Sequence, residues 1–401
     1  MYDVSVYLCS KFMFLRFFMI RLSTRRLRPG MVTAQSVYNR SGGSYLTRGT
    51  VITPQYIDKL KRIGISHITV TSADPSLNLP PPEDIVNEKT REEAIHRVYK
   101  AYTTLEKGGK LDIDPLAETA ESIISDLLSN KSNLVQMTDL RLYDDYTFAH
   151  SVNVAVLSTM IGITCKLSHK DLTNLTIGAL LHDVGKIDIP ISILNKPFSL
   201  SDDEFALIRN HPLSGYDRIM NLDIKHIDLR PLAMIACQHH EHLDGNGYPY
   251  HLKGGQVHRL ARMVAIADVY DALTTARSYK RAYSPYVASK IMTKCSGLQF
   301  DKELLTSFLE HVALYPVGTV LKTDLGYGIV KKIRIGLTNY PLIVIFADKS
   351  GDKLTTPVTI DTAEAAHDFI KGIVEEQQLL SLVYHLKMDP AILIADEFEN
   401  E

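Results

Sequence analysis

The sequence predicts a mainly α protein: an all-α helical bundle flanked by a small N-terminal α+β module and a small C-terminal β-rich module. Three observations predict this class. Apolar residues recur with helical spacing through the middle of the chain, the segments on both sides alternate in the manner of strands, and Gly-containing turns separate those strands. With 401 residues, 45% of them hydrophobic, the chain is long enough to form more than one hydrophobic core.

The N-terminal module is expected within residues 1–75. Two alternating stretches on either side of "NRSGG" predict a hairpin, and the helical pattern "PQYIDKLKRIG" is followed by the strand pattern "SHITV". The apolar segment 4–20 contains Lys11 and Arg16 and falls short of the ~20 uninterrupted apolar residues that a spanning helix needs. No small-residue cleavage site follows it, so we expect an N-terminal extension rather than a membrane anchor or a signal peptide.

The stretch "TSADPSLNLPPPEDI" is rich in Pro, Ser and Asp, which marks the first boundary and makes residues 76–115 a linker and a helix. Residues 116–315 are predicted to form a bundle of six or more helices. Two of these helices open with capping boxes, at Ser168 and at Ser201.

In residues 316–401, apolar runs joined by Gly-containing turns predict a small sheet or barrel. A closing helix is expected over "DTAEAAHDFIKGIV" and beyond.

Charge and cysteine content exclude some functions. The 44 basic and 46 acidic side chains are well mixed, for a net charge of -2, which argues against binding to a nucleic-acid polymer. The four cysteines form no CxxC pair and no disulfide-like pattern, which suits a reducing compartment. We therefore expect a cytoplasmic protein.

Histidines mark the predicted bundle as the place of the chemistry, because ten of the fifteen lie between His150 and His258. Each one alone is more often a packed or surface residue than a ligand. The pair His239 and His240 is different, since two adjacent imidazoles before a glycine turn would each need partners for two ring nitrogens. The pattern is not HExxH, because Asp244 stands where the second histidine would be, so a mononuclear protease site is disfavoured.

The candidate ligands exceed what one ion can use. They comprise five imidazoles and two carboxylates: His150, His182, Asp183, His211, His239, His240 and Asp268. Nitrogen and oxygen donors without thiolate favour a pair of Fe or Mn ions over Zn. Two ions about 3.5–4 Å apart, with a hydroxide held between them, are a standard arrangement for phosphoester hydrolysis. The residues themselves therefore indicate a binuclear metal centre.

The same motifs, in this order and spacing, resemble the HD-GYP subgroup of the HD superfamily of metal-dependent phosphohydrolases. The resemblance rests on "HS" at 150, "HDVGK" at 182, "HPLSG" at 211, "HHEHLDGNGYP" at 239 and "IADVYDALTTARSYK" at 266. It covers residues 120 to 315, about half of the chain, and implies that the bundle is an HD-type catalytic domain. It also implies a phosphodiesterase that hydrolyses the second messenger cyclic di-GMP to pGpG or on to GMP.

The resemblance assigns roles to individual residues. Asp183 would bridge two metal ions, Lys186 would contact a phosphate oxygen beside the metal-bound hydroxide, and Arg277 and Lys280 would bind the phosphates of the substrate. Asp271 is expected to support the centre rather than to bind a metal. The loop that gives the subgroup its name would position the histidines and form a lid or partner surface; it contains Asp244, Gly245, Gly247, Tyr248 and Pro249.

One position departs from the pattern. Some members have a glutamate four residues before the first histidine, which allows a third metal, whereas this chain has Tyr146 there. We therefore expect two metal ions, which disfavours efficient hydrolysis beyond pGpG.

The sequence leaves two other functions open: a signalling or binding module of the HD-GYP type without turnover, and a phosphohydrolase that acts on another cyclic dinucleotide or nucleotide. The sequence also does not identify the native metal or the signal sensed by the flanking modules. It does not show whether residues 1–18 belong to the mature protein, or whether the chain binds a second copy or a signalling protein.

Overall fold

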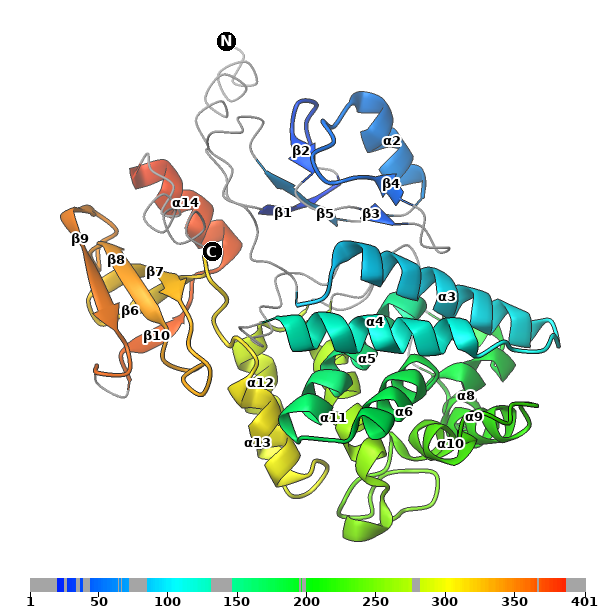
Figure 1. Cartoon of the computed structure of the whole chain (residues 1–401). Helices are drawn as coiled ribbons and strands as arrows, with labels where there is room; N and C mark the ends of the chain where they lie inside the picture. Colours follow the sequence, from blue (N-terminus) through cyan, green and yellow to red (C-terminus); the bar gives the residue numbers. More distant parts are fainter. Residues whose placement is uncertain are drawn as a thin grey trace.

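The computed structural model describes residues 20–24, 27–33, 37–38, 44–63, 65, 67–71, 85–130, 146–194, 196, 200–275, 282–365 and 368–386. Figure 1 shows a large helical body with a small α+β module and a β-rich module beside it. The mainly α class predicted from the sequence is confirmed. Within the described residues, no helix combines the length and the apolar character that crossing a membrane would require.

The N-terminal module is a small antiparallel sheet with one helix (Figure 1). Its three-stranded sheet has the order β1-β5-β2, and a second pair, β3-β4, is the hairpin expected around "NRSGG". Helix α2 begins after Thr53, whose side chain accepts a hydrogen bond from the backbone N–H of Tyr56. A separate core fills this module, and the bounds are β1 Ile20–Ser23, β2 Val32–Thr33, β3 Val37–Tyr38, β4 Ser44–Leu46, α2 Pro54–Arg62 and β5 His67–Thr71.

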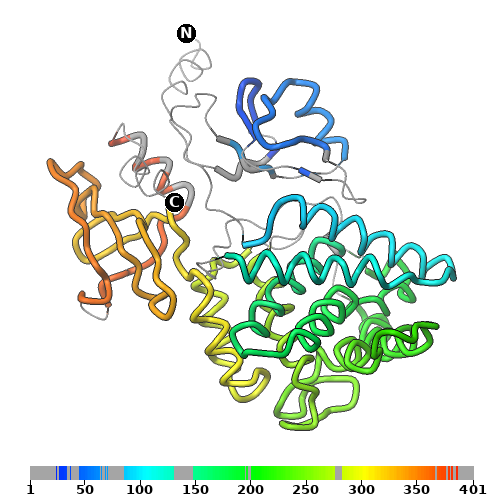
Figure 2. The backbone as a smooth tube through the Cα atoms, viewed as in Figure 1, coloured from blue at the N-terminus to red at the C-terminus, as the bar shows by residue number. Residues whose placement is uncertain are grey.

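The helical body contains the main hydrophobic core. Figure 2 follows its backbone from α3 and α4, in cyan, through the green helices to the yellow ones. The longer helices are α3 Glu88–Glu106, α4 Asp114–Ser129, α5 Tyr146–Thr164, α6 His169–Leu180, α8 Asp202–Arg209, α9 His211–Met220, α10 Leu229–Gln238, α11 Arg259–Thr274, α12 Pro285–Lys294 and α13 Lys302–Glu310. Short turns of helix connect some of them: η3 Val184–Asp188, α7 Ile191–Leu194 and η4 Gly254–Gln256.

Helix α5 lies at the centre of this body and packs against α3, α6, α11 and α13. Its buried residues face all directions, as expected of a helix enclosed by others. Helix α3, in the segment that the sequence assigns to a linker and a helix, packs against α4 and α5, and Ile95, Val98 and Tyr102 are buried in the same core. The centre of the body is therefore held between helices that come from distant parts of the chain.

The capping boxes at the starts of two helices differ in detail. Ser201 and Glu204 form the complete reciprocal box at the start of α8. At the start of α6, the Ser168 hydroxyl accepts from the backbone N–H of Asp171 and donates to the Asp171 carboxylate, so the second half of the box is absent there.

The C-terminal module is a five-stranded antiparallel sheet of order β10-β6-β7-β8-β9, followed by helix α14. The bounds are β6 Val320–Thr323, β7 Gly326–Lys332, β8 Leu342–Ala347, β9 Lys353–Asp361, β10 Ile370–Ile373 and α14 Glu376–Leu386.

The helix expected from residue 361 onward is wrong for the described residues 361–365 and 368–374. Strand β9 ends at Asp361, and Ile370–Ile373 form β10, which pairs with β6; the helix starts at Glu376. Helical preference gives way at Ile370–Ile373 because pairing with β6 satisfies the backbone groups of both strands, and Phe369 is buried in the core.

Candidate metal centre

His182 and Asp183 lie in the turn that follows α6. The helix ends at Leu180, with Leu181 as its cap. Gly185 belongs to the short helix η3, where a Cβ atom would come within 2.0 Å of the backbone oxygen of His211. Only glycine permits this approach, which brings the turn containing His182 and Asp183 against the start of α9.

In three histidines, a hydrogen bond from Nδ1 to a backbone oxygen orients the ring. The Nδ1 atoms lie 2.7 Å from the backbone oxygen of Ala179 for His182, 2.7 Å from that of Ile208 for His211, and 2.9 Å from that of Ala236 for His239. A carbonyl oxygen can only accept, so each Nδ1 carries the proton and each Nε2 presents a lone pair. All three rings are buried. Their free nitrogens therefore face inward as potential metal ligands.

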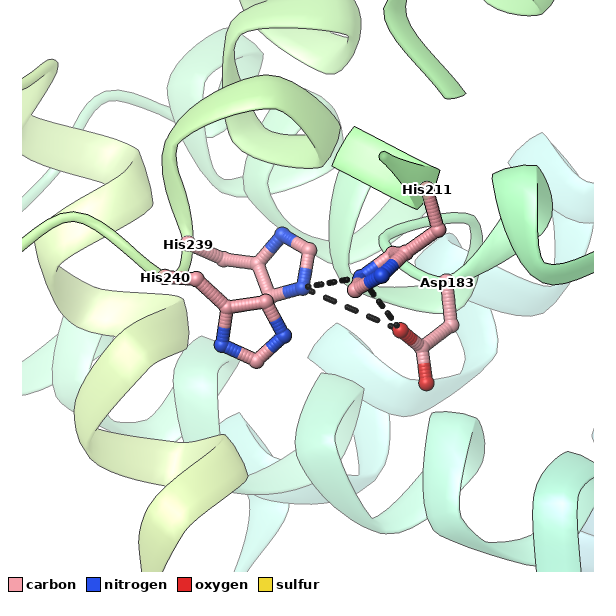
Figure 3. A group of neighbouring side chains, drawn as sticks. All are labelled: Asp183, His211, His239 and His240. Atoms are coloured by element: carbon pink, nitrogen blue, oxygen red, sulfur yellow. Dashed lines mark hydrogen bonds and ion pairs between the residues drawn. The ribbon is translucent and has the colours of Figure 1, made fainter. Parts of the chain in front are cut away.

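The first group of potential ligands combines Asp183 with His211, His239 and His240, whose ligand atoms all lie within 4.8 Å of one another. Figure 3 shows the carboxylate of Asp183 facing the rings of His211 and His239, with His240 beside His239. Asp183 Oδ1 lies 3.4 Å from His211 Nε2 and 3.7 Å from His239 Nε2. The two Nε2 atoms are 3.3 Å apart.

The second group contains His150, His182 and again Asp183. Here the other carboxylate oxygen is used: Asp183 Oδ2 lies 3.5 Å from His182 Nε2 and 4.0 Å from His150 Nε2. Asp268 lies between the groups, because its Oδ1 is 3.1 Å from His150 Nε2 and its Oδ2 is 4.0 Å from His240 Nδ1. The structure thus brings together all seven candidate ligands named from the sequence.

The donor atoms fit a bound cation. His182 Nε2 and Asp183 Oδ1 are buried polar atoms without a hydrogen-bond partner among the described residues, and such atoms are rare because leaving them unpaired costs free energy. Burial lowers the pKa of His211 to about 4 and that of His240 to about 3, and it also lowers the pKa values of His182 and His239. These four rings are therefore neutral near pH 7, which is the form that binds metals.

The two carboxylates are ionised. Burial of Asp183 opposes ionisation, but Lys186 and the surrounding histidines hold its pKa well below the usual value. Burial likewise opposes ionisation of Asp268, and His150 lowers its pKa nonetheless. In return, hydrogen bonds to Asp268 and Asp271 outweigh burial and raise the pKa of His150 to about 9. The centre therefore concentrates two ionised carboxylates and four neutral imidazoles around one buried volume, and His150 is the one ring whose pKa is raised.

Lys186 lies at the edge of the centre, in η3. Its Nζ donates a hydrogen bond of 2.5 Å to Asp183 Oδ2, and its side chain is partly exposed. The same ammonium group is thus near both the candidate ligands and solvent, a position from which it can reach a phosphate oxygen.

Contacts of Tyr248 and Glu241 hold the loop that follows His240. The ring of Tyr248 stacks on the ring of His240, with centroids 4.8 Å apart, and its backbone N–H donates to the backbone oxygen of His240. The buried carboxylate of Glu241 accepts hydrogen bonds from the backbone N–H groups of Tyr250 and Leu252.

The glycines and Asp244 of this loop shape its turns. Gly245 has φ +86, and a Cβ on Gly247 would lie 2.5 Å from the backbone oxygen of His240. Asp244 accepts from the backbone N–H of Asn246. These residues and Pro249 are described by the structure, whereas Arg277 and Lys280 lie outside the described residues. The side chain of Tyr146 also lies outside them.

Sequence reasoning missed three supporting residues. Asn153 donates a hydrogen bond to Asp271 and accepts one from Arg91, and Glu241 fixes the loop. Asn153 follows His150 by three positions and so shares its helix face, which is a readable signal. Glu241 adjoins His240, but its position alone does not indicate the loop residues that it contacts. The sequence around Arg91 does not indicate its hydrogen bond to Asn153, which lies 62 positions later.

Comparisons with known proteins agree with this geometry. Residues 122–304 match the family model described as HD domain. The chain is 35% identical over 220 residues to a cyclic di-GMP phosphodiesterase of Pseudomonas aeruginosa, covering 55% of this chain and 52% of that protein. It is 32% identical over 243 residues to a cyclic di-GMP phosphodiesterase of Thermotoga maritima, covering 59% and 65%. A 3'3'-cGAMP-specific phosphodiesterase of Vibrio cholerae is 34% identical over 165 residues, covering 41% and 31%.

The chain thus spans at most 65% of the length of any of these three relatives. The matched region coincides with the helices that carry the candidate ligands. The helical body of this chain is therefore similar to an HD domain and to the matched part of these cyclic di-GMP phosphodiesterases.

Proposed function

We propose that this chain is a metal-dependent phosphodiesterase that hydrolyses cyclic di-GMP at a binuclear metal centre. The observation that supports this most directly is the position of Asp183. One of its oxygens faces His211 and His239, and the other faces His182 and His150. A carboxylate placed between two sets of imidazoles is suited to bridge two cations.

The residues that would hold the ions are His150, His182, Asp183, His211, His239, His240 and Asp268. Their nitrogen and oxygen donors suit Fe or Mn, and no cysteine belongs to either group of ligand atoms found among the described residues. When bound, a pair of divalent ions would polarise a phosphate and lower the pKa of a water molecule.

The chain itself supplies charge and orientation. Lys186 would donate to a phosphate oxygen as negative charge grows there during attack on phosphorus. Asp271 accepts from Nδ1 of His150 and so directs the Nε2 of that ring into the centre. Arg277 and Lys280 are proposed to bind substrate phosphates, on the basis of their positions in the matched motif.

We further propose pGpG as the end product, because Tyr146 replaces the glutamate that would allow a third metal ion. A second candidate substrate is a hybrid cyclic dinucleotide, since one of the matching relatives is named a 3'3'-cGAMP-specific phosphodiesterase. A module that binds without turnover is the other class of function that remains.

The test is an anaerobic assay. The purified chain is loaded with Fe(II) or Mn(II), its metal content is measured, and cyclic di-GMP, 3'3'-cGAMP and cyclic di-AMP are supplied separately and then in competition. Products are identified by chromatography with mass detection. Formation of pGpG from cyclic di-GMP, absent in the Asp183→Ala variant, is the expected result.

Each alternative has its own outcome. Faster turnover of 3'3'-cGAMP would replace the substrate assignment. Full metal loading without turnover of any of the three nucleotides would instead assign the chain to the binding modules. Accumulation of GMP in place of pGpG would contradict the proposed end product.

A further inference from the structure

Helix α8 carries an aromatic and a cationic side chain that the hydrophobic core does not explain. None of its eight residues is buried, and Phe205 is 44% exposed. The guanidinium carbon of Arg209 lies 4.5 Å from the ring centroid of Phe205, one helical turn earlier. A pair of this kind on a free helix surface would be unremarkable by itself, because it contributes little to stability.

A contact outside α8 sets this pair apart. The guanidinium carbon of Arg209 also lies 5.3 Å from the ring centroid of Tyr248, in the loop that follows His240. Tyr248 in turn stacks on His240, with an angle of 26° between the rings. Phe205, Arg209, Tyr248 and His240 are therefore connected by two cation–π contacts and one ring stack, and we call these four residues the stacking series. It runs from an exposed helix to a candidate metal ligand.

The charge of Arg209 is available to a ligand. The nearby carboxylate of Glu204 is paired with Lys196, at 2.6 Å. No ion pair joins Arg209 to a carboxylate within the portion of the chain that the structure describes. A guanidinium without a carboxylate partner keeps N–H donors for a ligand, and its planar fork matches two adjacent acceptor atoms.

A cyclic dinucleotide offers two such pairs of acceptor atoms in addition to the phosphate that is cleaved. One source is the second phosphate, and the other is the N7 and O6 edge of guanine, to which arginine binds in a bidentate manner. The exposed ring of Phe205 adds a flat apolar surface of the kind on which nucleobases stack.

We propose that Arg209, held by Phe205 and Tyr248, binds the part of the cyclic dinucleotide that lies away from the scissile phosphate. This inference rests on the proposed function and adds a specificity-determining residue to it. Arg209 acts in the bound substrate and the transition state alike, so it lowers KM without changing kcat. Tyr248 links this contact to the metal centre, which explains why the loop is fastened to His240.

The experiment measures kcat and KM of the metal-loaded chain for cyclic di-GMP, cyclic di-AMP and the small diester bis(p-nitrophenyl) phosphate. The variants are Arg209→Ala, Arg209→Lys and Phe205→Leu, with Arg230→Ala as the control because Arg230 is also an exposed helical arginine of this domain. Loss of a charged bidentate contact is expected to raise KM for cyclic di-GMP about ten- to a hundredfold in Arg209→Ala. Arg209→Lys and Phe205→Leu should give smaller increases, and Arg230→Ala none.

The choice of substrates separates the two acceptors. An equal rise of KM for cyclic di-GMP and cyclic di-AMP indicates a contact with the second phosphate, whereas a rise confined to cyclic di-GMP indicates a contact with guanine. Either result supports the proposal if the rise for bis(p-nitrophenyl) phosphate, which has one phosphate and no base, is several-fold smaller.

Two results would overturn the inference in different ways. If the wild-type chain hydrolyses cyclic di-GMP and Arg209→Ala does so with the same KM, the role of Arg209 is refuted while the proposed function stands. If the wild-type chain hydrolyses only bis(p-nitrophenyl) phosphate, the proposed substrate is wrong and the role of Arg209 is refuted with it.

Discussion

The Nδ1 atom of His150 lies 2.7 Å from Oδ2 of Asp271, and both residues are buried. The other oxygen of Asp271 accepts from the side-chain amide of Asn153, whose oxygen accepts from Arg91 of helix α3. A candidate metal ligand is therefore oriented by a buried polar network that reaches the outer helix of the domain. Networks of this kind hold a ligand ring in one orientation and set which nitrogen carries the proton.

Replacing Asp271 should weaken metal binding more than folding. In Asp271→Asn, the side chain keeps its size but loses the charge that holds the Nδ1 proton of His150. We expect a loss of about 10- to 100-fold in metal affinity, the range typical of residues that orient a ligand. Metal titration with a competing chelator measures it, and Asp217→Asn, at an exposed position of α9, is the matched control. Unchanged affinity would show that the charge of the Asp271 carboxylate is not needed to orient His150.

Removal of the proposed bridging carboxylate should cause loss of bound metal and loss of activity together. Asp183→Ala takes away both oxygens that face the imidazole groups, so the measured metal content should fall below two ions per chain, and turnover should be lost with it. Elemental analysis of the purified variant and product analysis on the same sample check this. A variant that keeps two ions and full turnover would refute the assignment of Asp183.

Lys186 should behave differently, because it is proposed to act on the phosphate and not on the ions. Lys186→Ala is expected to retain the metal content and to lower kcat about 10²- to 10³-fold, the range found when one donor to a developing charge is removed. Lys186→Arg should recover part of the rate. Loss of metal from Lys186→Ala would instead assign Lys186 to holding Asp183 in place, through the hydrogen bond seen between them.

The positions of the candidate ligands could be predicted from the sequence because each lies in a readable local context. His239 and His240 follow a helical pattern and precede a glycine turn, and Asp268 interrupts an apolar helix face. Their convergence depends on long-range packing, yet few arrangements satisfy so many buried imidazoles at once. The network through Arg91 could not be predicted, since nothing near Arg91 in sequence indicates a partner on α5.

One local prediction failed because a tertiary contact outweighs a local preference. The sequence from residue 361 onward favours a helix, but Ile370–Ile373 pair with strand β6 in the sheet. The local helical preference is worth less than about 1 kcal/mol per residue. Gly185 likewise has a tertiary role, because it lets η3 approach the backbone of His211.

The metal-free protein should lose stability as the pH falls below neutrality. Burial holds the pKa of His211 at about 4 and that of His240 at about 3, while the ordinary value for histidine in an unfolded chain is about 6.5. The unfolded chain therefore binds protons that the folded chain excludes, and stability declines from about pH 6.5 down through pH 4.

Thermal unfolding in the presence of a chelator, measured between pH 7.5 and 4.5, tests this dependence. His211→Gln should show a shallower decline than the wild type, whereas His226→Gln, at an exposed position, should follow the wild type. Equal slopes for all three proteins would mean that His211 is solvated or charged in the folded state. His150 acts in the opposite direction: its pKa of about 9 contributes stability below pH 6.5 that is lost as the pH rises through 9.

Glu241 should fix the loop without binding metal. Its buried carboxylate accepts from the backbone N–H groups of Tyr250 and Leu252, so Glu241→Gln turns an amide NH₂ toward donors and leaves one of them unpaired. We expect a loss of about 1–3 kcal/mol in the free energy of unfolding, measured by urea denaturation. Glu303→Gln, at an exposed site on α13, controls for the loss of charge.

The same variant discriminates two roles of the loop. In the sequence, Tyr248 lies between Glu241 and the residues whose backbone N–H groups bind Glu241. Loosening the loop should therefore disturb the stack of Tyr248 on His240. We expect KM for cyclic di-GMP to rise while two ions stay bound. Loss of an ion in Glu241→Gln would show that the loop sets the position of His240 itself. Full stability together with an unchanged KM would show that Glu241 has neither role, and that the glycine turns and the contacts between Tyr248 and His240 hold the loop without it.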